Sequence, residues 1–329
     1  PPLPGRRGLT MALQATTRCN GFWYEEQITE ELHLRMVFKK VLFDSESEFQ
    51  RVQIIDTVPF GKTLVLDDHT QSSSLDEHIY HESLVHPAMM AHGAPKTVFI
   101  GGGGEGATAR EVLRWQSVEK VVMVDLDEVA CKMCQEHLPE WNTGVYEDSR
   151  FEIHYKDAYA FLKDYNGPKF DVVIMDISDP IECGPGIALY FKEFYKEVLL
   201  PKMSDHSVFV TQSGACGVLN KDEVFTTIHN TLKNSFSSVH GYAVDIPSFG
   251  CPWGFNMCYN NCAFPDAPDW DPKDTESRLT AAVGAPTAAQ FSCYDGVGHR
   301  NLFALPKWVR KGCEEETRVM CKATPVFLS

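Results

Sequence analysis

The sequence predicts an α/β protein in which a small N-terminal antiparallel β-domain precedes a Rossmann-like, doubly wound and mostly parallel sheet. Residues 31–70 alternate apolar and polar side chains between turns, and from residue 97 short apolar strands alternate with helical segments. A glycine-rich turn, VFIGGGGEG at 98–106, follows the first of these apolar strands. The 329 residues are enough for both parts.

The first part of the chain is predicted to be a tail followed by hairpins. Residues 1–20 have a short and broken apolar stretch, which predicts a disordered N-terminal tail rather than a secretory signal. Residues 21–74 are the predicted β-domain, with strands in LHLRMVF, FQRVQIID and TLVLDD and a turn at PFGK. The pattern then changes, because DEHIYHESLVHPAMMA has the spacing of a helix.

Residues 75–329 are the predicted Rossmann-like domain. The predicted strands are TVFI, VEKVVMVDLD, FEIHYKD, FDVVIMDI and SVFVTQS. The predicted helices are TAREVLRW, residues 127–138, AYAFLKDY, ALYFKEFYKEVLLP and EVFTTIHNTLKNSF. These strands are almost wholly apolar, as expected where helices cover both faces of a parallel sheet. From about residue 265 the chain becomes polar and rich in proline and alanine, which predicts a C-terminal extension that regains order at LPKWVRKGCEEETRV.

The composition argues against several classes of function. The net charge of −15 disfavours a nucleic-acid partner and is compatible with a cationic ligand. No apolar run is long enough to cross a bilayer, so we expect no membrane association. The 11 cysteines are odd in number and scattered, which predicts free thiols in a reducing, cytoplasmic compartment. The pairs Cys131/Cys134 and Cys258/Cys262 have no matching partner pair, so we expect no metal site.

The glycine-rich turn predicts a nucleoside-like ligand. Gly101, Gly103 and Gly106 fit the dinucleotide pattern G-x-G-x-x-G, and Asp125 ends the next strand. Glu105, however, would repel a pyrophosphate on this turn by on the order of several kcal/mol. The turn therefore favours an adenosyl sulfonium, with Asp125 on the ribose hydroxyls and Glu105 on the positive tail. The alternative is that Glu105 points to solvent at a helix N-terminus, where it suits the helix dipole.

Further carboxylates end the other parallel strands. Asp157 follows FEIHYK, Asp176 follows FDVVIM, and Asp179 lies in the loop after it. Because the carboxyl ends of parallel strands meet at one edge of an open sheet, these side chains together predict an acidic cleft of adenosine size. Each of them alone has a second interpretation, as a helix N-cap.

An acidic cleft beside a sulfonium site suits a polyamine. An amine that has lost its proton can attack the carbon next to the positive sulfur and displace a thioether. Asp176 is the candidate base, and alignment of the two reactants would supply most of the rate. Tyr80 and Tyr242 are candidates to hydrogen-bond the amine and flank its methylene chain, and Trp253 is a further wall candidate. The alternative for all three aromatic residues is a place in the core.

Several motifs resemble those of the aminopropyltransferase family, which includes the spermidine and spermine synthases. They are QSSSLDEHIYHESLVHP, GGGGEGATAREVL, VVMVDLDE, MDISDPIECGPG and FVTQSG. The segments WYEE, YHE and IPSFGCPWG are most similar to the plant-type thermospermine synthases, and the resemblance runs from about residue 21 to the end. It implies a small β-domain before a Rossmann-like, methyltransferase-like catalytic domain. It also implies transfer of an aminopropyl group from decarboxylated S-adenosylmethionine to a polyamine, with release of methylthioadenosine and without a metal or a tightly bound cofactor.

The resemblance also implies roles for individual residues. Donor contacts are implied for Gln50, His81, Glu105, Asp125, Asp157 and Ala158. Polyamine contacts are implied for Gln71, Tyr80, Asp176, Asp179 and Tyr242. Among these, Asp176 matches the proton acceptor, Glu105 the residue that holds the donor's amine, and Asp125 the ribose-binding carboxylate.

The chain departs from spermidine synthases at three of these positions. It has Glu105, Asp125 and Ala158 where those enzymes usually carry Asp, Glu and Gly. The first two changes keep the charge and shift its reach, in agreement with a thermospermine-type pocket. We therefore expect spermidine as acceptor and thermospermine as product. The alternatives are putrescine as acceptor, spermine as product, or a methyltransferase on the same fold. The resemblance further implies a homodimer or a homotetramer.

Overall fold

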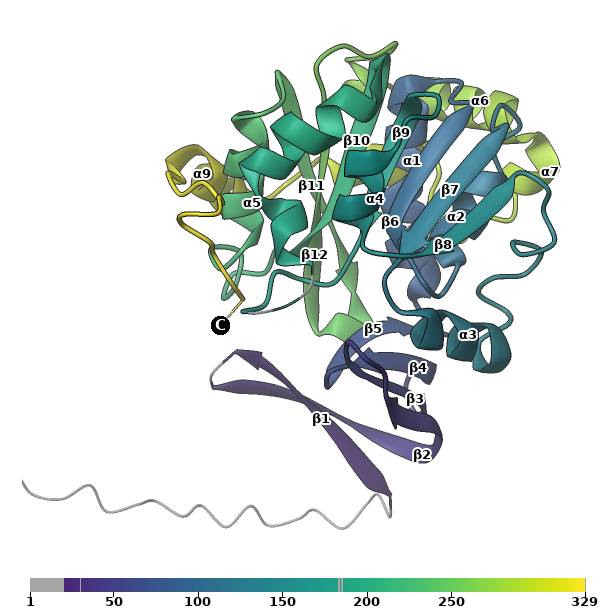
Figure 1. Ribbon diagram of the computed structural model, residues 1–329, viewed down its shortest axis with the longest axis vertical. Coiled ribbons are helices and arrows are strands. Elements are labelled where there is room, and N and C mark those ends of the chain that lie inside the picture. Colours follow the sequence, from purple (N-terminus) through teal and green to yellow (C-terminus); the bar gives the residue numbers. More distant parts are fainter. Residues whose placement is uncertain (1–20, 30, 183, 185, 329) are drawn as a thin grey trace, which may run out of the picture.

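The computed structural model describes residues 21–29, 31–182, 184 and 186–328, so the predicted tail at 1–20 lies outside the described residues. Two sheets organise the chain: five strands in the order β1-β2-β3-β4-β5, and seven in the order β11-β12-β10-β9-β6-β7-β8. Figure 1 shows the small sheet (purple) beneath the larger one, which carries helices on both faces. The predicted fold class is confirmed, whereas the exact domain boundaries stay a prediction.

The N-terminal sheet is a run of antiparallel hairpins. Its strands are β1 (Phe22–Thr29), β2 (Leu32–Glu46), β3 (Arg51–Thr57), β4 (Gly61–Leu66) and β5 (His69–Ser73). Asp67 and Asp68 join β4 to β5 with φ angles of 47° and 64°. A two-residue hairpin turn whose twist matches the strands needs positive φ at both positions, and aspartate tolerates this conformation.

The seven-stranded sheet is parallel over most of its width. Its strands are β6 (Thr97–Gly102), β7 (Lys120–Asp125), β8 (Phe151–Tyr155), β9 (Phe170–Asp176), β10 (Met203–Ala215), β11 (Ser238–Ile246) and β12 (Cys251–Tyr259). β8, β7, β6, β9 and β10 pair in parallel, and β12 and β11 complete one edge in antiparallel orientation. β6 has β7 on one side and β9 on the other, so the strand order reverses at β6.

Helices bury both faces of this sheet, which explains its nearly continuous apolar strands. The helices are α1 (Glu77–His92), α2 (Ala107–Leu113), α3 (Glu128–His137), α4 (Ala158–Asp164), α5 (Phe225–Lys233), α6 (Pro272–Val283), α7 (Ala285–Ala288), α8 (Gly296–Leu302) and α9 (Lys307–Glu315). α1, α2, α6 and α8 share a hydrophobic cluster with one face. α4 and α5 share a second cluster with the other face. Among the described residues, none of the helices has both the length and the apolar character that crossing a bilayer requires.

One predicted helix was wrong, and two strands were not predicted. The predicted single helix in ALYFKEFYKEVLLP consists of a 3-10 turn, η1 (Ile187–Tyr190), a π-helical turn, η2 (Phe194–Leu199), and a second 3-10 turn, η3 (Leu200–Lys202). Pro201 has no N–H and collides with the preceding helical turn, so a regular α-helix cannot continue to the end of this segment. β11 and β12 were missed because Gly241, Pro252 and Gly254 interrupt their strand pattern.

Helix α3 packs against the N-terminal sheet and joins the two parts. Val52, Ile54 and Leu64 of the small sheet form one cluster with Cys134 and Leu138 at the α3 end of the larger part. Cys134 and its neighbour in the C-x-x-C motif are buried free thiols. The motif therefore serves packing, and the contact closes the base of a cavity between the sheets.

Candidate active site

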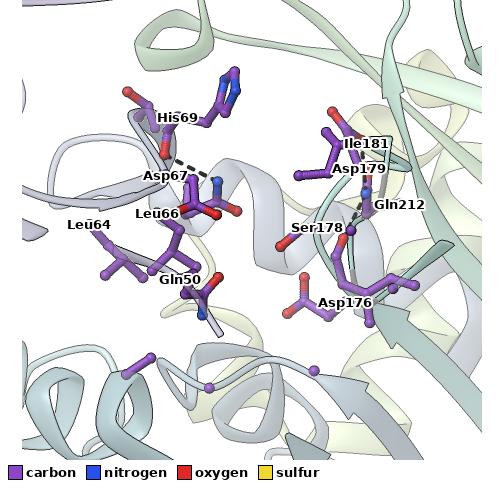
Figure 2. Close-up of a pocket in the computed structure, with 18 of the residues that line it drawn as sticks. Gln50, Leu64, Leu66, Asp67, His69, Asp176, Ser178, Asp179, Ile181 and Gln212 are labelled. Atoms are coloured by element: carbon purple, nitrogen blue, oxygen red, sulfur yellow. Dashed lines mark hydrogen bonds between the residues drawn. The ribbon is translucent and has the colours of Figure 1, made fainter. Parts of the chain in front are cut away.

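A cavity of about 450 Å³ lies between the two sheets, at the carboxyl ends of β6, β7 and β9. Figure 2 shows two facing walls, with Gln50, Leu64, Leu66, Asp67 and His69 from the N-terminal part and Asp176, Ser178, Asp179, Ile181 and Gln212 from the larger part. Because the strand order reverses at β6, this is the position at which open α/β sheets bind ligands.

The glycine-rich turn packs directly on β9. Gly102 and Gly103 have φ angles of 78° and 74°. A Cβ atom at Gly102 would lie 2.0 Å from the carbonyl oxygen of Asp176. The N–H of Gly103 donates to this same oxygen at 2.9 Å. Only glycine permits this approach, and the approach brings the turn beside the Asp176 carboxylate.

Glu105 is a fixed negative charge in the cavity wall. Its side chain lines the cavity and the residue is only 9% exposed, which contradicts the solvent-facing alternative. Its Oε1 accepts a hydrogen bond from Ser72 Oγ at 3.1 Å and lies 3.1 Å from His81 Nε2. Burial alone would raise the pKa of Glu105, but His81 outweighs it and holds that pKa below its ordinary value.

His81 lies behind Glu105 and is not among the described residues that line the cavity. The donor contact implied for His81 stays a prediction, and in the structure its Nε2 contacts Glu105. His81 Nδ1 lies 2.7 Å from the Glu77 carbonyl and 2.8 Å from its Oε2, and Arg110 donates two hydrogen bonds to the Glu77 carboxylate, at 3.0 and 2.9 Å. Burial alone would lower the pKa of His81, but Glu105 and Glu77 raise it to about 10. The charged ring thus links Arg110 and Glu77 to Glu105.

This cluster suits a positively charged organic group better than a metal. One ligand atom each from His81, Glu105 and Asp176 lies within 4.8 Å of the others. Both ring nitrogens of the charged His81 donate hydrogen bonds, so neither has a lone pair for a metal. Two carboxylates around one imidazolium leave a net negative charge that an ammonium or sulfonium can balance.

Asp125 ends β7 and lines the cavity. Its Oδ1 accepts the N–H of Asp127 at 2.8 Å, and Asp127 in turn caps α3. Burial, followed by the charge of Glu105, raises the pKa of Asp125 to about 6 despite this backbone hydrogen bond. Gln50 also lines the cavity, and its Nε2 donates to Asp127 Oδ2 at 2.9 Å. This end of the cavity, with Asp125 and Gln50, thus takes residues from both parts of the chain.

Asp157 and Ala158 both line the cavity after β8. Asp157 is also the N-cap of α4, since its Oδ1 accepts the N–H of Ala160 at 2.9 Å. Asp157 therefore caps α4 and also lines the cavity, because a cap bond to one oxygen leaves the other oxygen of the carboxylate accessible.

Asp176 lies at the end of β9, beside Glu105. Tyr80 Oη donates to its Oδ1 at 2.6 Å and Thr108 Oγ1 to its Oδ2 at 2.5 Å. Burial, reinforced by the charge of Glu105, raises the pKa of Asp176 to about 6. The carboxylate is held in one orientation and is more basic than an ordinary aspartate.

Asp179 follows in the next loop and is oriented by a glutamine that the sequence analysis did not single out. Gln212 Nε2, from β10, donates to Asp179 Oδ1 at 3.0 Å. Gln212 Oε1 accepts from Trp253 Nε1 at 3.2 Å, so Trp253 supports the site and also lines the cavity. Burial raises the pKa of Asp179 to about 6. Gln212 lies in the quoted motif FVTQSG, but only the pairing of β10 with β9 reveals its partner.

Tyr242 is not among the described residues that line the cavity, and its implied polyamine contact stays a prediction. It is fully buried, donates to the Ser83 carbonyl at 2.9 Å and stacks on Phe255. The core alternative therefore holds for Tyr242, and Phe249 of η4 (Pro247–Phe249) lines the cavity instead. Gln71 does line the cavity, with its Nε2 donating to the His69 carbonyl at 3.1 Å.

The N-terminal sheet adds an acidic side chain that the sequence analysis missed. Glu26 of β1 lines the cavity with only 8% exposure, and its Oε1 lies 3.7 Å from His69 Nδ1. The nearby Glu26 carboxylate favours the charged ring and raises the pKa of His69. The pattern of β1 gives no local sign of this role, because the cavity forms only when the two sheets meet.

Two known protein families match the chain. Residues 77–265 match the spermine/spermidine synthase domain, and residues 22–73 match the spermidine synthase tetramerisation domain. The chain belongs to the spermine/spermidine synthase family. The first match alone covers more than half of the chain, and the resemblance in the sequence motifs is confirmed.

Relatives of this family extend over nearly the whole chain. It is 44% identical to thermospermine synthase ACAULIS5 of Arabidopsis thaliana, over 93% of this chain and 87% of the relative. It is 38% identical to a polyamine aminopropyltransferase of a Synechococcus strain, over 92% of this chain and 96% of that protein. The chain is thus an aminopropyltransferase-family enzyme.

Solved spermidine synthase structures share its architecture. One, in complex with the transition-state analogue AdoDATO, superposes with a TM-score of 0.79 at 26% identity, over 90% of this chain and 96% of that one. The spermidine synthase of Thermotoga maritima gives a TM-score of 0.78 at 25% identity, over 94% and 99% of the two chains.

Proposed function

We propose that the enzyme transfers the aminopropyl group of decarboxylated S-adenosylmethionine to spermidine, giving thermospermine and methylthioadenosine. The observation that carries this proposal is one cavity that holds Glu105 beside the glycine-rich turn and Asp176 and Asp179 at the adjoining strand end. The 44% identity to a thermospermine synthase supports the choice of acceptor and product.

The donor end has the charges that a decarboxylated sulfonium requires. Asp125 can accept both ribose hydroxyls, and Glu105 can hold the terminal ammonium of the aminopropyl arm. Asp157, Ala158 and Gln50 complete the donor wall, while His81 holds Glu105 in place. The α-carboxylate of intact S-adenosylmethionine would meet this negative wall unpaired, which disfavours methyl transfer.

The acceptor end aligns an amine for attack. Asp179 and Gln71 can hold its chain, while Tyr80 keeps Asp176 aimed at the reacting nitrogen. The neutral nitrogen forms a bond to the aminopropyl carbon next to sulfur as the carbon–sulfur bond breaks. The electron pair of the carbon–sulfur bond leaves with the thioether, methylthioadenosine, and Asp176 accepts the proton of the new ammonium.

A product analysis tests this function. The purified enzyme is incubated with the donor and either spermidine or putrescine, and the amines are separated by chromatography against thermospermine, spermine and spermidine standards. We expect thermospermine, which forms when the amine on the three-carbon arm of spermidine attacks. Spermine would show attack from the four-carbon arm, and turnover of putrescine alone would identify a spermidine synthase.

The enzyme is further proposed to be a homotetramer or homodimer in the cytoplasm. The match of residues 22–73 to a tetramerisation domain supports self-association through the N-terminal sheet. Size-exclusion chromatography with light scattering separates the two states. A fluorescent fusion tests the compartment.

A further inference from the structure

The segment after α9 returns to the active-site cavity. Every second residue from 316 to 320 forms a hydrogen bond with α5, and residue 320 also bonds the chain between η1 and η2. These are Glu316 Oε2 with Thr226 Oγ1 (2.8 Å), the Arg318 carbonyl with Asn230 Nδ2 (2.8 Å), Met320 N with Thr231 Oγ1 (2.8 Å) and the Met320 carbonyl with Lys192 N (3.0 Å). Met320 is fully buried in the cluster that covers this face of the sheet. The path of the segment is therefore fixed before it reaches the cavity.

The far end of this segment contacts the loop that carries Asp179. Leu328 N–H donates to the Pro180 carbonyl at 2.8 Å, and Leu328 forms a parallel β-bridge with Ile181. Leu328 and Ile181 both line the cavity, and Figure 2 shows Ile181 next to Asp179 on the same wall. The segment thus contacts the backbone directly after Asp179.

Within its described residues the loop has other hydrogen bonds as well, from Tyr190 Oη to the Ser178 carbonyl at 3.0 Å and from Gly184 N–H to the Ile181 carbonyl at 3.0 Å. Pro180 has no N–H to donate, and Gly184 and Gly186, which follow it, give the chain conformational freedom. On the Asp179 side, Gln212 Nε2 holds the Ile177 carbonyl at 2.7 Å. On the opposite side of Asp179, the contact with Leu328 ties the loop to a segment that is distant in sequence, whereas the bond from Gly184 is local to the loop.

We propose that Leu328 is a positioning residue that sets acceptor affinity, by holding the turn Asp179–Ile181 against the cavity and adding an apolar wall for the methylene chain of the amine. This inference rests on the proposed function, because it assigns Asp179 to the acceptor. Glu105 and Asp125 lie on other strand ends and do not contact this segment, so donor affinity should not depend on it.

Four variants test the inference by separate KM values for donor and spermidine. Leu328→Pro removes the N–H, and we expect its spermidine KM to rise about tenfold while its donor KM stays within about twofold, as for one lost hydrogen bond that orients a charged group. Leu328→Ala keeps the N–H and removes the wall, for a rise of about threefold. Leu328→Met keeps both and should restore most of the affinity. Lys322→Ala, an exposed position in the same segment, is the matched control.

Thermal unfolding of each variant separates a positioning role from a general loss of structure. A spermidine KM that is unchanged in Leu328→Pro, or a donor KM that rises in step with it, overturns the inference. If Leu328→Pro fails to fold, Leu328→Ala decides, and an unchanged spermidine KM again overturns it. Absence of spermidine turnover by the unmodified enzyme would instead contradict the proposed function.

Discussion

Asp176 is a carboxylate whose two oxygens each accept a hydrogen bond from a neutral hydroxyl. Tyr80 and Thr108 fix its orientation without neutralising its charge. Glu105, in the same cavity, is paired with the charged His81, so the two acids have opposite pKa shifts. This difference suits one group that stays ionised and binds, and a second that accepts a proton.

Replacement of Asp176 by asparagine should abolish most turnover. Asn keeps the size of the side chain but cannot accept the proton, so we expect kcat to fall by at least about a hundredfold. Donor affinity, measured by calorimetry, should stay within about threefold. Asp164→Asn, at an exposed carboxylate, is the control. Turnover near that of the unmodified enzyme would remove Asp176 from the role of base.

The activity should depend on pH through Asp176. Its pKa is raised to about 6, so the basic form is present above that pH and is lost as the pH falls through it. We expect kcat/KM at fixed ionic strength to decline below about pH 6, since this ratio reports the groups of the free enzyme. A profile that stays flat to pH 5, with the protein still folded by circular dichroism, would contradict this assignment.

Replacement of Glu105 by glutamine should weaken donor binding. The neutral amide leaves the substrate ammonium without a carboxylate and leaves the buried His81 paired with Glu77 alone, so the donor KM should rise at least tenfold, by about 1.4 kcal/mol or more. Glu105→Asp keeps the charge and should cost less. Equal donor KM values in the glutamine variant and the unmodified enzyme would exclude the ammonium contact.

The sequence located the carboxylates of the site because strand ends have a predictable position. Glu105, Asp125 and Asp176 each follow an apolar strand, and parallel strands bring their carboxyl ends to one edge. No comparable rule predicts from sequence whether a single aromatic or imidazole side chain lines a cavity or lies behind its wall. Tyr242 and His81 therefore proved to lie behind the cavity wall, and Gln212 was missed.

At the scale of elements, Asp76 joins three pieces of chain beside one wall of the cavity. It lies between β5 and α1, is 2% exposed, and accepts hydrogen bonds from Ser73 Oγ at 2.6 Å, Ser248 N at 2.8 Å and Ser248 Oγ at 2.8 Å. Ser248 belongs to η4, next to Phe249, which lines the cavity. This carboxylate therefore fixes an aromatic wall of the site from a distance.

Loss of this junction should destabilise the fold. Asp76→Ala leaves a buried backbone N–H without a partner, and we expect the free energy of unfolding to fall by about 2–4 kcal/mol. Ser248→Ala removes only a hydroxyl donor and should cost about 1 kcal/mol. Urea unfolding at one fixed protein concentration measures both. Equal stability of the Asp76→Ala protein and the unmodified one would contradict the role of the junction.

The parallel strands and most helices of the large sheet could be predicted from periodicity, because uninterrupted apolar runs followed by amphipathic segments have few alternative folds. The strands β11 and β12 could not be predicted in this way. Their residues Gly241, Pro252 and Gly254 are typical of turns, and only pairing with β10 makes them a sheet edge. The helix predicted before Pro201 was wrong for a related reason, because proline disrupts the helical turn that precedes it.

At the scale of the whole molecule, three half-buried carboxylates with pKa values of about 6 share one cavity: Asp125, Asp176 and Asp179. Because these values are raised above those of an unfolded chain, their contribution favours the folded state at low pH and is lost as the pH rises through about 6. A bound cation compensates for the ionised form and should therefore stabilise the protein more at higher pH.

Thermal unfolding with and without ligand tests this coupling. Saturating spermidine should raise Tm by a few degrees more at pH 8 than at pH 5.5. The uncharged methylthioadenosine is the matched control, and its effect should change less between the two values. A spermidine shift that is equal at both pH values, or larger at pH 5.5, would show that these carboxylates do not bind the cation in their ionised form.

Because the cavity has one wall from each sheet, Asp176 and the lining residues Glu26 and Gln71 belong to separate building blocks. Changes in β1 or β5 can alter the length and polarity of the amine that fits while Asp176, in the other block, keeps its surroundings. Such a division lets acceptor preference diverge among descendants of one ancestor without disturbing the bond-making step, and it directs efforts to re-engineer the amine range toward the smaller block.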